Sequence, residues 1–112
     1  MKDWDGRSGG VWLTPTLGNG WVNFGGGFQN AAYRRDGNVV RLKGLIKSGT
    51  IGAGAFTLPA GYRPGGTHMA SAVDGSNTPA ARVDVAPGGQ VTPQTGNNAF
   101  ISLDGITFVA EL

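Results

Sequence analysis

The sequence predicts an all-β protein, a compact antiparallel β-sandwich of the jelly-roll type. Gly and Pro account for 21 and 6 of the 112 residues, and they separate short apolar runs instead of forming one tract. The turn signals recur every ~8–12 residues, which is typical of sandwiches and jelly rolls. No segment has the sustained 3.6-residue period of an amphipathic helix. The length allows one domain.

The first ten residues differ in composition from the rest of the chain. Residues 1–10 are charged and end in Ser-Gly-Gly, a flexible composition that predicts a linker or the end of an upstream stalk. We therefore expect the β-sandwich to span 11–112. Its first two strands are expected at 11–14 and 21–24, each ended by a following proline or glycine.

The clearest hairpin signal is Asp36-Gly37, which separates two extended runs at 28–35 and 39–47. An Asp-Gly pair between strands is typical of a type I′ turn, because that turn needs positive φ at both central residues. Along 39–47, apolar residues and Gly44 occupy the even positions, and mostly cationic residues occupy the odd ones. This period of two predicts one long, half-buried strand.

The remainder of the chain continues as short strands between turns. A loop at 49–54 and a corner at 60–66 surround a short strand that Pro59 ends. The final hairpin is expected to turn at Asp104-Gly105. We therefore expect about nine or ten strands in all. The last six are expected at 55–58, 68–73, 81–86, 90–93, 99–103 and 106–110.

Charge and composition argue against several classes of function. Nine basic and seven acidic residues give a net charge of +2, which is not the footprint of a nucleic-acid-binding protein. No apolar run approaches the ~20 residues of a membrane-spanning helix, so we expect no membrane insertion. The absence of Cys excludes disulfides and Cys-ligated metals.

The sequence predicts no catalytic residue, no metal site and no cofactor. The single histidine, His68, has no Glu or His at metal-ligand spacing. Asp36, Asp74 and Asp104 all precede glycine, which indicates turn residues. Asp84 then has no obvious carboxylate partner, although a glycosidase needs two carboxylates roughly 5–10 Å apart. We therefore expect a protein that is not an enzyme.

The aromatic residues predict both the core and an association face. A small chain rich in glycine buries little surface and loses much backbone entropy on folding, so an isolated monomer should be marginal. Association through an apolar face would complete the burial. Aromatic rings beside arginines are also found in saccharide sites, which is the alternative interpretation. The rings expected in the core and at subunit seams are Trp12, Trp21, Phe24, Tyr33, Phe56, Tyr62 and Phe108.

Three blocks of sequence resemble a known family. They are NGWVNFGGGFQNAAYRRDGNVVRLKG (19–44), GTIG with FTLPAGYRP (49–52 and 56–64), and FISLDGITF (100–108). In this order they are similar to the C-terminal module of bacteriophage tail-fibre and minor tail proteins, over about 12–110. The resemblance implies a homotrimeric, all-β receptor-binding head at the end of a fibre or baseplate stalk. It implies a virion protein that binds a bacterial cell-wall or surface polysaccharide, without catalytic residues.

The less similar stretch, 65–98, is where receptor specificity should vary, and polar residues in or beside it are the expected receptor contacts. Two alternatives remain open. One is a structural virion module without receptor binding, such as a capsid decoration or head-fibre trimer. The other is the carbohydrate-binding appendage of a bacterial enzyme. The expected receptor contacts are His68, Asp74, Asn77, Arg82, Asn97 and Asn98.

Overall fold

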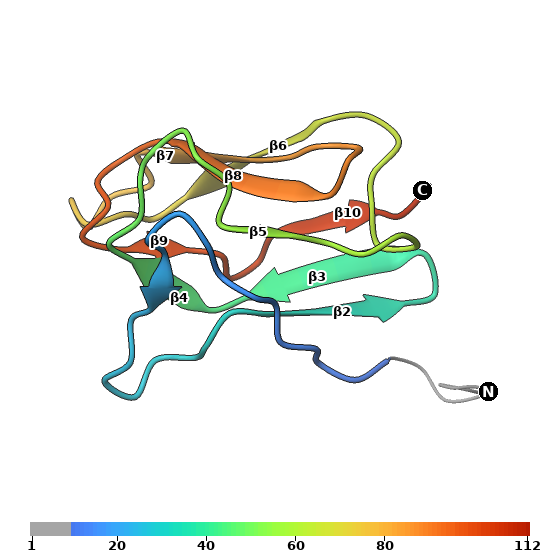
Figure 1. The fold of residues 1–112 in the computed structure, drawn as a ribbon, viewed down its shortest axis with the longest axis horizontal. Helices are drawn as coiled ribbons and strands as arrows, with labels where there is room; N and C mark the ends of the chain where they lie inside the picture. The colour runs from blue at the N-terminus through green and yellow to red at the C-terminus, as the bar shows by residue number, and fades with distance from the viewer. Residues whose placement is uncertain (1–9) are drawn as a thin grey trace.

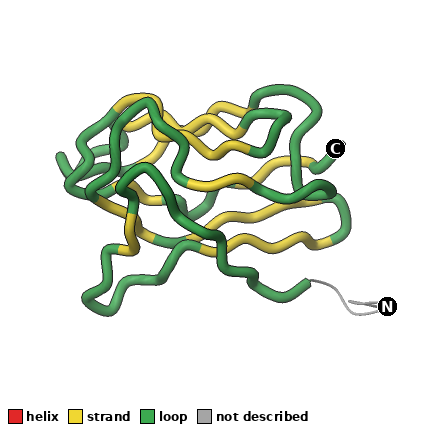
Figure 2. Tube along the Cα trace, viewed as in Figure 1, coloured by secondary structure: helices red, strands yellow, loops and turns green. Residues whose placement is uncertain are grey.

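The computed structural model describes residues 10–112, which form ten β-strands and no helix (Figures 1 and 2). This confirms the predicted all-β class. This part of the chain accordingly holds no helix that could cross a membrane. The expected linker, Gly10 apart, lies outside the described residues. The strands are β1 (Val22–Asn23), β2 (Ala32–Asp36), β3 (Val39–Lys43), β4 (Leu45–Lys47), β5 (Phe56–Thr57), β6 (His68–Ala72), β7 (Ala81–Val85), β8 (Gln90–Thr95), β9 (Ile101–Ser102) and β10 (Thr107–Val109).

The strands form two layers that face each other (Figure 1). One layer is the four-stranded sheet β5-β8-β7-β6. The other is the sheet β10-β3-β2, which β1-β4-β9 continues, since only Gly44 separates β3 from β4. Every pairing between these strands is antiparallel, so the predicted antiparallel sandwich is confirmed. The expected trimer remains a prediction.

The core lies between the layers and takes its side chains from both. Val40 and Leu42 of β3 point inward from one layer, and Val83 and Val85 of β7 point inward from the other. All four are almost inaccessible to water. Full burial of such a side chain stabilises the fold by about 1.5–3 kcal/mol relative to exposure. The inward residues therefore hold the two layers together.

The single long strand expected at 39–47 is wrong, because the chain bends at Gly44. Its φ of 113° belongs to a region that side chains rarely adopt, and its backbone lies directly against Ala31. A Cβ at this position would come within 2.5 Å of Ala31 Cα. The predicted alternation is nevertheless confirmed, since Val40, Leu42 and Ile46 are all buried. One segment thus serves two sheets.

The hairpin expected at the C-terminus is also wrong. Strands β9 and β10 do not pair with each other: β9 pairs with β4, and β10 pairs with β3. The segment 101–109 therefore runs antiparallel to the whole β3–β4 segment, and it bends opposite the bend at Gly44. Gly44 donates its N–H to Asp104 Oδ1 at 2.8 Å and accepts one from Leu103, also at 2.8 Å. These two hydrogen bonds fasten the bends to each other.

The β2–β3 hairpin is confirmed, but its turn differs from the expected one. Asp36 pairs with Val39, so the two-residue loop is Gly37-Asn38. Only Gly37 has a positive φ, of 61°. Positive φ at the first central residue alone is the pattern of a type II′ turn, whereas type I′ needs it at both.

The strand expected at 11–14 is wrong, since this stretch makes only an isolated bridge between Leu13 and Tyr33. Gly10 likewise lies along β2, donating its N–H to the carbonyl of Arg35 at 3.0 Å. The arm expected at 28–35 begins as a strand only at Ala32. The other expected strands are found at their predicted places, most of them shorter.

Candidate functional site

Four of the six expected receptor contacts come together at one end of the sandwich. Asp74 and Asn77 lie in the loop between β6 and β7, and Asn97 and Asn98 lie in the loop between β8 and β9. Both loops are at the left in Figure 1, away from the two ends of the chain. We call this region the loop end.

Asp74 joins the two loops to each other. It is only 1% exposed, so the expectation that it lies on the surface is wrong. Its carboxylate accepts hydrogen bonds from the hydroxyl and backbone N–H of Ser76 and from the N–H of Asn97, the last at 2.7 Å. These bonds, the one from the Ser76 hydroxyl above all, lower the pKa of Asp74. The ionised carboxylate therefore fixes the loop geometry.

The three asparagines play different parts in the loop end. Asn98 donates its side-chain amide to the carbonyl of Gly49 at 2.8 Å, and Asn97 accepts the N–H of Ala99 at 2.9 Å. Asn77 is held by its backbone, whose N–H donates to the carbonyl of Asp74 at 2.8 Å. Its side-chain amide is exposed and makes no hydrogen bond to another group within residues 10–112. Asn77 is therefore the one of the three whose side-chain amide is not engaged within this part of the chain.

His68 and Arg82 do not join this cluster. The half-buried ring of His68 packs against Phe108, with ring centroids 5.7 Å apart. Arg82 makes two hydrogen bonds, of 3.0 and 2.8 Å, to the nearly buried carboxylate of Asp84. These bonds lower the pKa of Asp84 and raise that of Arg82. No group of three His, Asp or Glu residues within 10–112 could hold a metal ion.

An open groove at the loop end was not foreseen from the sequence. It has a volume of about 500 Å³, and Phe24, Phe28 and Phe100 line it together with Val73, Asn77 and Asp104. The Phe24 ring makes edge-to-face contacts with Phe28 at 5.4 Å and with Phe100 at 5.9 Å. We call this the aromatic groove.

The local sequence explains why Phe28 lies at the surface. The three preceding residues, Gly25–Gly27, all have positive φ, between 62° and 90°. This conformation is accessible to glycine and costly for other residues. It carries the chain out of β1 into an exposed loop, so that Phe28 is 58% exposed. The sequence did contain a signal for this loop, namely three glycines directly before an aromatic residue. We had instead expected a strand to begin at residue 28.

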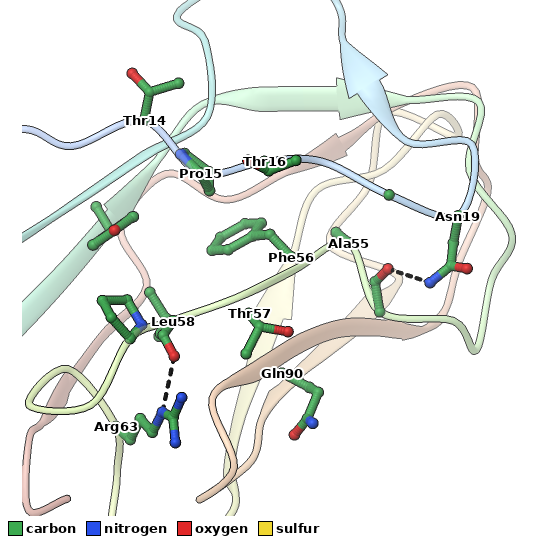
Figure 3. A pocket seen from close by; sticks show the side chains of 14 residues that line it. Thr14, Pro15, Thr16, Asn19, Ala55, Phe56, Thr57, Leu58, Arg63 and Gln90 are labelled. Atoms are coloured by element: carbon green, nitrogen blue, oxygen red, sulfur yellow. Dashed lines mark hydrogen bonds between the residues drawn. The ribbon is translucent and has the colours of Figure 1, made fainter.

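A second open groove of about 610 Å³ lies on the side of the sandwich, between segment 14–19 and β5 (Figure 3). Its floor is formed by the buried rings of Tyr33 and Phe56. Arg63 and Gln90 lie at its rim, and Arg63 Nε donates to the carbonyl of Leu58 at 2.8 Å. We call this the side groove.

The expected scaffold aromatics occupy three kinds of position. Trp21, Tyr33, Phe56 and Phe108 are buried in the core, where burial raises the pKa of the Tyr33 hydroxyl. Tyr62 packs edge-to-face on Tyr33 at 5.3 Å, and Phe24 lines the aromatic groove. Trp12 lies outside the core: it is 37% exposed, with Lys43 Nζ 4.4 Å from its ring centroid.

Neither a known protein family nor a curated protein matches the sequence. The fold, however, is shared with a phage receptor-binding protein. That protein is the receptor binding protein (gp15) of Listeria phage PSA, which superposes with a TM-score of 0.74 at 24% sequence identity. The match covers 91% of this chain and 66% of that one, so this chain spans just under two thirds of that protein. The expected resemblance to a phage receptor-binding module is confirmed at the level of the fold.

Proposed function

We propose that this chain is a non-enzymatic receptor-binding module, carried on the tail of a phage or tail-like particle, that attaches the particle to a bacterium. The observation that carries the proposal is the fold shared with a phage receptor binding protein over 91% of the chain. The three blocks of sequence that resemble tail-fibre modules agree with it. Residues 11–112 then form the tip, and 1–10 belong to a linker or to the end of a stalk.

The receptor in this proposal is a cell-wall or surface polysaccharide, met by the loop end. The arrangement supports this orientation, because Gly10 lies beside β2 at the opposite end from the loops (Figure 1). A stalk that precedes Gly10 would leave the loop end facing outward. Several copies on one particle would raise a weak affinity per site through effective concentration.

We also propose that the module works as a homotrimer. Its support is the set of large apolar side chains that the protomer leaves exposed, which include Val11, Trp12, Met69 and Val109. Surfaces of this kind are commonly covered by a partner, and three copies around a threefold axis are a closed arrangement that can cover them. Light scattering on the dilute protein should give three times the mass of the chain. A well-folded monomer would contradict this part of the proposal.

The experiment that tests receptor binding uses the fluorescently labelled chain on intact bacteria, with Listeria cells first because the similar protein comes from a Listeria phage. We expect saturable binding to some strains, lost when their surface polysaccharides are chemically removed. An array of bacterial saccharides identifies the ligand. A folded trimer that binds neither any cells nor any saccharide would instead favour the structural virion module.

A further inference from the structure

Resting on the proposed attachment function, we infer that the aromatic groove is the saccharide site and that its ligand is an uncharged sugar. The sugar stacks on Phe28 and forms hydrogen bonds with Asn77. Of the receptor contacts expected from the sequence, Asn77 alone lines this groove.

The groove offers a rigid apolar surface whose exposure to water is unfavourable. Phe28 is 58% exposed, and burial of apolar area is favourable by about 25 cal/mol per Å². Its edge-to-face contact with Phe24, with an interplanar angle of 89°, fixes the direction in which the Phe28 ring faces. Phe24 is fixed in turn by Phe100. A ring held in this way can stack on the C–H face of a sugar without first losing side-chain freedom.

The polar groups of the groove suit hydroxyl groups. The amides of Gln29 and Asn77 make no hydrogen bond to other groups within the described residues, and both lie in the lining. An amide offers both a donor and an acceptor, as a sugar hydroxyl does. Asn77 is also well positioned, since its backbone is bound to Asp74, which is itself fixed by the other loop. A second copy of the chain, packed through an apolar face, would leave these amides unpaired.

Charge and size limit the ligand further. The lining contains one carboxylate, that of Asp104, and no lysine or arginine, while Lys47 Nζ lies 5.1 Å from the centroid of the Phe24 ring. With one carboxylate in the lining and one ammonium beside it, the groove has no excess of positive charge to hold a phosphate or uronate polymer, which favours an uncharged saccharide. The volume of about 500 Å³ falls within the range of small-molecule sites, roughly 300–1,000 Å³. In contrast, the side groove has Arg63 at its rim and keeps its rings buried in its floor.

The test compares variants for binding to cells or saccharides that the unaltered chain binds. We expect Phe28→Ala to weaken binding at least tenfold, as for an exposed aromatic anchor, and Asn77→Ala to weaken it severalfold. Both variants should keep the melting temperature and the oligomeric state. Gln90→Ala is the matched amide control in the side groove, and this variant should bind normally. Binding should also be unchanged between 50 and 500 mM NaCl, because no ionic contact is involved.

Each contrary result has a distinct meaning. If the unaltered chain binds no bacterium and no saccharide, the proposed function itself fails. If it binds while Phe28→Ala and Asn77→Ala bind equally well, or if Gln90→Ala is the variant that loses binding, the groove assignment is overturned and the function stands. A change of oligomeric state in Phe28→Ala would make the groove a subunit seam, and a steep loss of binding with salt would make the ligand charged. Either result overturns the inference.

Discussion

Replacing Trp21 by alanine should be among the most destabilising substitutions in this protein. Trp21 is 2% exposed, and its ring lies directly on the backbone of Gly49, where a Cβ would come within 1.9 Å of Trp21 Cδ2. Its Nε1–H also donates to the carbonyl of Ala53 at 3.3 Å. Because Gly49 has no side chain that could fill the vacated space, most of the cavity should persist.

The magnitude follows from area and from precedent. A buried aromatic ring removes ~150–250 Å² from water, which at ~25 cal/mol per Å² gives an upper estimate of ~4–6 kcal/mol. Large-to-small substitutions of this kind cost about 3–5 kcal/mol, more when the site cannot collapse. We therefore expect Trp21→Ala to lower the free energy of unfolding by about 4–5 kcal/mol, and Tm by roughly 16–20 °C at roughly 4 °C per kcal/mol.

Calorimetry or circular dichroism is the suitable assay, since tryptophan fluorescence changes with the substitution itself. Phe28→Ala serves as the control, because Phe28 is 58% exposed and lies outside the core. A loss below about 1 kcal/mol for Trp21→Ala, the size of a surface contact, would refute this account of the core. So would a larger loss for Phe28→Ala than for Trp21→Ala.

Two further predictions concern the bend and the loop end. Gly44→Ala should strongly lower the stability measured in thermal melts, because a Cβ at this position would clash with Ala31 and the φ of Gly44 is unfavourable for alanine. Gly18→Ala is the control: a Cβ at position 18 meets nothing within 4 Å, so stability should change by less than about 0.5 kcal/mol. Asp74 has a pKa that folding lowers, so its ionised form stabilises the fold fully above the ordinary value of 3.8, and this contribution is lost as the pH falls below 3.8 through the folded-state pKa. Asp74→Asn should therefore melt lower at pH 7 and lose less stability than the unaltered chain on acidification; parallel loss in both would contradict the role of the carboxylate.

The sequence was most informative where local pattern and burial coincide. The alternation along 39–47 correctly predicted that Val40, Leu42 and Ile46 point inward, since period two alone decides which face a residue takes. It could not predict the bend at Gly44, because that bend depends on the close approach of Ala31, which directly precedes β2. The false C-terminal hairpin has the same origin. Asp104-Gly105 does form the expected turn, but the Asp104 carboxylate bonds to Gly44, sixty positions earlier, and the strands on either side of the turn pair with β4 and β3.

The candidate site was harder to predict for a related reason. Polarity indicated loop residues correctly, but it did not distinguish Asp74, which is buried between two loops, from Asn77, which is exposed. That difference arises from the hydrogen bond to the N–H of Asn97, a residue of a different loop. The hydrophobicity of Phe28 likewise favoured placing it in a strand, whereas the glycine loop before it brings the ring to the surface.

The low identity to the similar phage protein bears on how a module with the proposed function could change its ligand. At 24% identity most superposed positions differ in residue type, yet the fold is retained with a TM-score of 0.74. A sandwich tolerates such change if its buried positions stay apolar and of similar total volume. The aromatic groove is built mainly from the loop before β2 and from the loops that flank β9, so its lining can be replaced without disturbing β3, β7 or β8.

The hydrogen bond between Asp74 and Asn97 limits this replacement. Any new loop sequence must preserve an acceptor for the N–H of Asn97 or lose the fixed position of residue 77. For the proposed function, receptor specificity should therefore vary most readily at position 77, which lies in the stretch 65–98 and whose side chain makes no hydrogen bond within the described residues.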